Sequence, residues 1–106
     1  MRRAFIAMAV VVPLLTRAAV DPCLPAVPAD QDHLLFQYVP WLSEHEAGQL
    51  DAKLVRFARE TSNQVAIVVV DTLCGYDPGE FAFRLGESWG LGKAEWDNAV
   101  LILVKP

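Results

Sequence analysis

Two uncharged runs of aliphatic residues limit what this chain can fold into. Residues 65–70 (VAIVVV) and 99–104 (AVLILV) are each six residues long and contain no polar side chain. Runs that are apolar at every position are typical of strands covered on both faces, as in parallel sheets. Parallel neighbours need a long crossover, and residues 71–98 are enough for a helix and its loops. We therefore predict an α/β fold with a strand, a helix and a second strand in that order.

The first residues of two helices are also recognisable. Ser43 is followed three positions later by Glu46, which is the pattern of a capping box. Asp77 and Pro78 begin the second helix, with a capping side chain and a proline at the first helical position. Residues 34–38 (LLFQY), before the first helix, are either a further strand or a segment packed beneath that helix.

The spacing of apolar residues predicts which face each helix buries. In the first helix they recur three or four positions apart, and the charged residues fall on the opposite, solvated face. The apolar stripe comprises Ala47, Leu50, Leu54, Phe57 and Ala58, and the charged face Glu44, Asp51, Lys53, Arg56 and Glu60. The second helix is expected to bury Phe81, Leu85, Ser88 and Trp89. Asn63 and Gly90, which adopt the left-handed conformation readily, are the predicted helix ends.

Residues 1–18 have the pattern of a secretory signal peptide. Two arginines precede a twelve-residue apolar run at positions 4–15, and small residues follow it. The run is shorter than the roughly 20 residues of a transmembrane helix, and Pro13 interrupts it. Cleavage after Ala18 fits best, and the alternative is an uncleaved anchor. We expect a mature chain that is exported to the periplasm or secreted and has no transmembrane helix, with association to a membrane as an alternative to a free chain.

Charge and cysteine content limit which ligands this chain is expected to bind. Removal of residues 1–18 leaves six basic and thirteen acidic residues. A chain with this acidic excess lacks the basic surface that proteins use to bind the phosphates of nucleic acid. Residues 19–33 are expected to be a proline-spaced tether, and residues 34–106 the folded part. Cys23 and Cys74 are far apart and neither belongs to a CxxC motif, so zinc has no support. Whether these cysteines pair after export stays open.

An ordered set of motifs resembles the TPM domain family. In chain order they are TSNQVAIVVV at 61–70, GYDP at 75–78, WGLGK at 89–93 and DNAVLILV at 97–104. The resemblance implies a three-layer α/β/α sandwich around a mixed sheet. Residues 34–106 would then form only its N-terminal part, so we expect the chain to be cut short within the domain. The family has glycine where Ala99 stands, which would be strained if that position required a positive φ.

The resemblance also implies a Ca²⁺ or Mg²⁺ site. Asp97 and Asn98 precede the last predicted strand, and Asp71 follows the previous one at the edge where α/β sheets bind ligands. The alternative for Asp97 and Asn98 is a turn into the strand, where both residue types are favoured by local hydrogen bonds. For Asp71 it is a residue at the end of a strand that bonds its own loop backbone. Parallel strands would place Asp71 and Asp97 at opposite ends of the sheet. One shared site would require the intervening loop to fold over the sheet.

Two functions of different classes remain. The first is an exported accessory module that binds calcium and supports an unidentified partner protein or a membrane or periplasmic complex. The alternative is a metal-dependent acid phosphatase, in which a cation polarises a phosphate ester. The sequence contains no recognisable nucleophile or general acid in a catalytic arrangement, so the accessory role is favoured. Trp89 and Trp96 are expected to be packing residues and not a ligand platform.

Overall fold

The computed structural model describes residues 21–29, 32–93 and 96–106. The predicted signal peptide and its cleavage point lie outside these residues. In chain order the elements are β1 (Leu35–Gln37), α1 (Glu44–Thr61), β2 (Gln64–Val69), α2 (Pro78–Trp89) and β3 (Ala99–Val104). The α/β prediction is confirmed, and the segment before the first helix is a strand.

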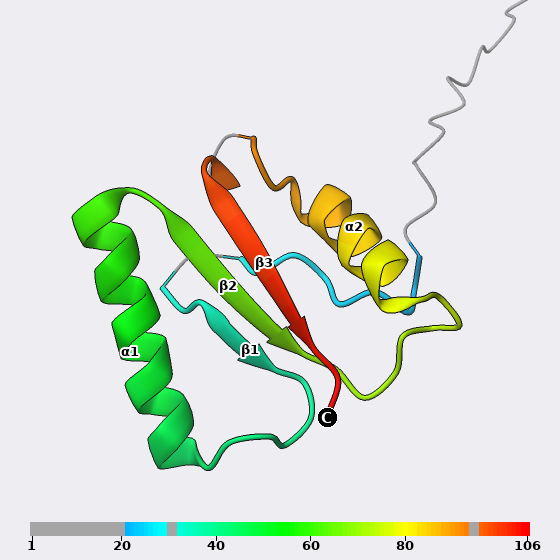
Figure 1. Ribbon diagram of the computed structural model, residues 1–106, viewed down its shortest axis with the longest axis horizontal. Coiled ribbons are helices and arrows are strands. Elements are labelled where there is room, and N and C mark those ends of the chain that lie inside the picture. The colour runs from blue at the N-terminus through cyan, green and yellow to red at the C-terminus, as the bar shows by residue number, and fades with distance from the viewer. Residues whose placement is uncertain (1–20, 30–31, 94–95) are drawn as a thin grey trace, which may run out of the picture.

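The sheet has the order β1-β2-β3, with both strand pairs parallel. Its register aligns Leu35, Ile67 and Ile102 across the three strands. Figure 1 shows α1 on one side of this sheet and α2 on the other, so the described elements form three layers. The mixed sheet implied by the resemblance stays a prediction, because every described strand pair is parallel.

The central strand β2 forms the core, as an unbroken apolar run predicts. Ala66 and Val68 are fully buried on one face, and Val69 is fully buried on the other. The neighbouring strand β3 is covered on one face only. Its Leu101 packs against the core, whereas 57% of Val100 is exposed on the opposite face. Among the described residues, β3 therefore presents an uncovered apolar face.

Helix α2 has the predicted ends and nearly the predicted inner face. The Asp77 side chain accepts a hydrogen bond from the backbone N–H of Glu80 at 2.8 Å, and Gly90 ends the helix with φ 76°. The buried residues of α2 are Phe81, Leu85, Gly86 and Trp89. The expectation that Ser88 is buried is wrong, because its side chain points to solvent.

Helix α1 begins as predicted but differs in its inner face. Both bonds of the capping box between Ser43 and Glu46 are present. The left-handed residue at its end is Ser62, with φ 63°, and not Asn63 as predicted. The prediction that Phe57 belongs to the buried stripe is also wrong, because 44% of the residue is exposed. A larger departure concerns Asp51, which turns from the predicted solvated face toward the start of β1.

Candidate functional site

The segment that leads into β3 contains two of the predicted metal ligands. Asn98 has φ 56°, and its carbonyl oxygen accepts a hydrogen bond from the backbone N–H of Gln64 at 3.0 Å. Asn98 thus forms the turn that aligns β3 with β2. Ala99 is the first residue of β3 and is not among the described residues with positive φ. The anticipated strain from alanine at this position is therefore absent.

Asp97 lines a pocket of about 300 Å³ beside the beginning of β2. The residues around this pocket are Leu34, Val55, Ala58, Arg59, Ser62, Gln64 and Asp97. One basic and one acidic residue, Arg59 and Asp97, thus line the same pocket. Sequence spacing did not indicate Arg59, because it reaches this pocket from the far end of α1.

Asp71 lies at the other end of the sheet. It follows the last residues of β2 and is exposed, whereas Asp97 precedes β3. The register aligns the first residue of β2 with the first of β3, so six strand residues, or roughly 20 Å, separate the two carboxylates. The structure therefore does not bring Asp71 and Asp97 together.

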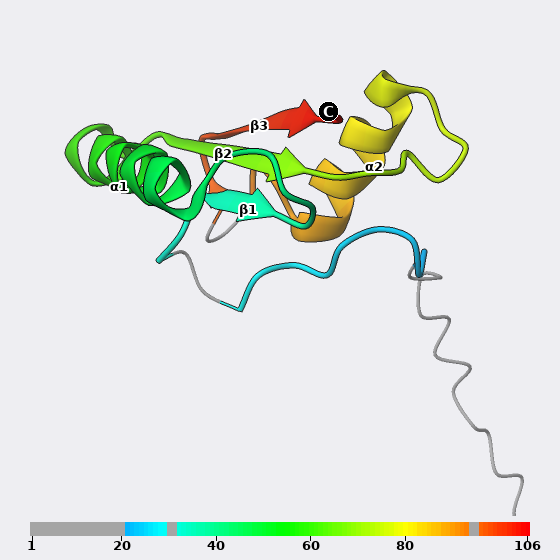
Figure 2. The same cartoon turned by 90° about the horizontal axis from the view of Figure 1, so that it is seen from below.

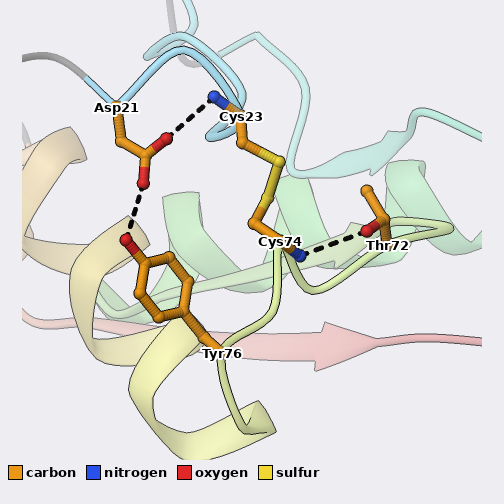
Figure 3. The surroundings of a disulfide bond; sticks show 5 residues. All are labelled: Asp21, Cys23, Thr72, Cys74 and Tyr76. Carbon is orange, nitrogen blue, oxygen red and sulfur yellow. Dashed lines mark hydrogen bonds between the residues drawn. A yellow bond between two sulfur atoms is a disulfide. The ribbon is translucent and has the colours of Figure 1, made fainter.

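Cys23 and Cys74 form a disulfide bond with their Cα atoms 6.1 Å apart. It joins two segments that are 51 residues apart in sequence, as Figure 3 shows. One is the N-terminal strap, by which we mean residues 21–29; the other is the loop between β2 and α2. Cys74 has φ 57°, and its backbone N–H donates to the Thr72 hydroxyl at 3.1 Å. The open question from the sequence is answered in favour of pairing.

A second attachment of the strap lies beside the disulfide. The Tyr76 hydroxyl donates a hydrogen bond to the Asp21 carboxylate at 2.8 Å (Figure 3). A backbone N–H bond from Cys23 and this phenol bond hold the pKa of Asp21 below its ordinary value. The same bond to a carboxylate raises the pKa of Tyr76. Arg84 lies over the Tyr76 ring, 4.5 Å from its centroid, and pairs with Glu80 on α2.

The third attachment involves the buried tryptophans. Trp89 donates from its indole N–H to the Pro25 carbonyl at 3.0 Å. Its ring contacts Phe36 of β1 edge-on and lies 5.9 Å from Trp96. Trp89 and Trp96 are 3% and 4% exposed, which confirms them as packing residues. The strap thus crosses the aromatic end of α2 on the β1 side of the sheet, away from β3 (Figure 2).

The model of one known family matches most of this folded region. It is the TPM domain, and the match covers residues 36–106. The chain belongs to the TPM domain family. A search of curated proteins found no match. The matched range contains β2, β3, both helices and the three residues predicted to bind metal.

Of the three predicted Ca²⁺ or Mg²⁺ ligands, only Asp97 and Asn98 lie at the same end of the sheet. Calcium takes six to eight oxygen ligands, and magnesium needs near-octahedral geometry. Asp97 and Asn98 supply two side chains, and the third candidate, Asp71, is at the other end of the sheet. No cluster of three or more acidic, histidine or cysteine side chains exists within residues 21–29, 32–93 and 96–106. No catalytic step through a metal follows from these residues.

One polar site in the TPM domain was missed by the sequence pattern. Asp51 of α1 accepts hydrogen bonds from the backbone N–H groups of Leu34 and Leu35 at 2.7 and 3.0 Å. Its other oxygen lies 2.7 Å from His33 Nδ1. Burial alone would raise the pKa of Asp51, but these three bonds outweigh it and hold the pKa below its ordinary value. This carboxylate fixes the start of β1 against α1.

Proposed function

We propose that this TPM domain is an accessory module that acts by contact with another polypeptide. The observation that carries the proposal is the uncovered face of β3. Val100 and Ile102 are 57% and 44% exposed on a strand that pairs only with β2 among the described residues. An exposed apolar strand face is a surface against which an apolar segment of a partner can pack. The excess of acidic over basic residues favours a partner with a basic rim.

Calcium binding belongs to the same proposal. Asp97 and Asn98 immediately precede β3 and would supply two ligands to the cation. A cation held there would lie beside Ala99, the first residue of β3. Binding of the cation could then affect binding of a partner to the uncovered face of β3. We propose an exported location, from the signal-peptide pattern at residues 1–18. Within the described ranges, no helix is both long and apolar enough to cross a membrane.

Calcium titration followed by amide NMR tests the metal part of the proposal. We expect millimolar calcium to shift the amides of residues 96–99 in the full chain, and Asp97→Asn to abolish the shift. Asp71→Asn is the matched control, because it removes an equally exposed carboxylate at the opposite end of the sheet. Calcium binding at Asp97 would be refuted if the amide shifts were lost equally in Asp97→Asn and Asp71→Asn, or if calcium caused no shift in the parent chain.

A strand substitution tests the contact part independently. Ile102→Lys places a charge on the uncovered face of β3 and should abolish capture of a basic, β-strand-forming peptide library on the immobilised chain. Phe83→Lys is the matched control, because Phe83 is 65% exposed on α2. Equal capture by the parent and Ile102→Lys would refute the docking face. Calcium-dependent hydrolysis of p-nitrophenyl phosphate, lost in Asp97→Asn, would favour the phosphatase alternative instead.

A further inference from the structure

The N-terminal strap depends on few contacts apart from its disulfide. Among residues 21–29 none is fully buried, and none belongs to a helix or strand. Two backbone N–H groups of the strap, those of Cys23 and Leu24, are bonded within the strap to Asp21. These local bonds shape the strap but do not attach it to the domain.

Non-covalent contacts also attach the strap to the rest of the domain. Among the described residues they include the Tyr76 bond to Asp21, the Trp89 bond to the Pro25 carbonyl, and apolar packing of half-buried Leu24 on the core. Beyond Pro25 the fit is loose. Val27, Pro28 and Ala29 face the tryptophans across a space of about 460 Å³.

The entropy of the strap opposes these contacts. Ordering nine residues costs more than two hydrogen bonds and the half-buried side chains of Leu24, Pro25 and Pro28 return, although the three prolines of the strap reduce that cost by restricting the free chain. A covalent link removes much of the remaining cost, because it keeps the strap close to its binding surface. The strap is therefore expected to stay in place while the disulfide is intact and to leave when it is broken.

We propose that the Cys23–Cys74 disulfide is a redox-sensitive clasp, and that a dithiol reductant releases the strap and uncovers Trp89 and Trp96. Cys23 is exposed and Cys74 is half-buried, so we place the attack of the reductant at Cys23. Release would expose an aromatic surface at the β1 side of the sheet, on the side opposite from β3 (Figure 2). This inference does not depend on calcium binding or on the docking face of β3.

The exchange chemistry is that of any protein disulfide. A thiolate of the reductant attacks Cys23 Sγ, a mixed disulfide forms, and the bond to Cys74 breaks. Cys74 leaves as a thiolate and is protonated. The second thiol of the reductant then attacks the mixed disulfide, which frees Cys23 as a thiol. The dithiol is oxidised to a disulfide, and two electrons and two protons pass to the protein.

Tryptophan fluorescence in the full chain tests the proposal. The third tryptophan, Trp41, is 42% exposed, so a Trp41→Phe background makes the signal report Trp89 and Trp96 alone. Acrylamide quenching is measured before and after dithiothreitol, with thiols counted to establish reduction. Hydrogen exchange at the Val68 amide reports whether the core stays folded. Cys23→Ser/Cys74→Ser in the same background supplies the open form without reductant, and Tyr76→Phe removes one strap contact while keeping the disulfide.

We expect reduction to raise the quenching constant about threefold or more while the Val68 amide stays protected, as for opening of a local unit. The double cysteine variant should match the reduced chain, and oxidised Tyr76→Phe should stay close to the parent. Two free thiols with unchanged quenching would overturn the proposal, because the strap would then hold without its clasp. Loss of Val68 protection on reduction would also overturn it, since the disulfide would then be needed by the whole domain.

Discussion

Replacement of Asp51 tests the central claim about how this domain is held together. A single carboxylate on α1 satisfies two backbone N–H groups at the start of β1, at 2.7 and 3.0 Å, and lies 2.7 Å from His33. Leu34, one of the two donors, is 1% exposed, so water cannot easily replace the lost acceptor. Asp51→Ala leaves both donors without the carboxylate. Because β1 has only three residues, it has few other bonds to compensate.

The cost follows from the number and kind of bonds lost. A hydrogen bond to a charged group contributes about 1.5–3 kcal/mol, and an unsatisfied buried donor costs about 1–3 kcal/mol. We therefore expect Asp51→Ala to lower the free energy of unfolding by roughly 2–4 kcal/mol, a large part of the 5–15 kcal/mol typical of a domain. Asp51→Asn keeps an acceptor for Leu34 and Leu35 and should cost about 1 kcal/mol. Urea unfolding at pH 7 measures both values.

The pH dependence of the free energy of unfolding is a second, independent test of the role of Asp51. The folded pKa of Asp51 is lowered by its three bonds, so its contribution is fully present above the ordinary pKa of the unfolded carboxyl. It is lost as the pH falls through the lower folded pKa, and Asp51→Asn should lack this part of the acid destabilisation. Glu60→Ala, an exposed carboxylate on the same helix, is the control and should change stability by less than about 0.5 kcal/mol. Equal unfolding free energies for Asp51→Ala and Glu60→Ala would refute the reasoning.

Three further substitutions test local claims. Ser43→Ala removes the capping box of α1 and should lower stability by about 1 kcal/mol in a thermal melt; an unchanged melt would contradict the cap. Gly90→Ala adds a Cβ that meets no atom within 4 Å, so only its φ of 76° opposes it, and urea unfolding should show a loss of about 1–2 kcal/mol. Phe81→Ala empties a fully buried position and should cost about 3–5 kcal/mol by urea unfolding, whereas a loss below about 1 kcal/mol would place Phe81 outside the core.

The features predicted correctly from the sequence depend on local or periodic patterns. The capping box at Ser43, the Asp77 cap and the apolar run of β2 each follow from a few neighbouring residues, and the structure contains all of them. Asp51 was assigned wrongly because its spacing matches the charged face of α1. Its true position is decided by unpaired N–H groups of β1, a partner 16 to 17 residues away. Helical periodicity contains no information about that partner.

For the candidate site too, the sequence predicted what strand topology decides and did not predict what tertiary packing decides. Topology alone placed Asp71 and Asp97 at opposite ends of the sheet, because parallel strands fix which residues share an end. The composition of the Asp97 pocket was not predictable, since Arg59 reaches it from the end of α1 through tertiary packing. The pairing of Cys23 with Cys74 was not predictable either, because tertiary packing brings together two residues that are 51 positions apart in sequence.

Arg59 also decides how calcium binding at Asp97 should behave. Both side chains line one pocket of about 300 Å³, so the guanidinium repels any cation that Asp97 binds. We expect Arg59→Gln to tighten calcium binding about fivefold, which corresponds to about 1 kcal/mol. Isothermal titration of the full chain measures the effect, with Lys53→Gln as a control that removes an exposed charge from the same helix. A Kd that is the same in Arg59→Gln and Lys53→Gln would mean that the cation binds away from this pocket, and Asp97 would then have no part in it.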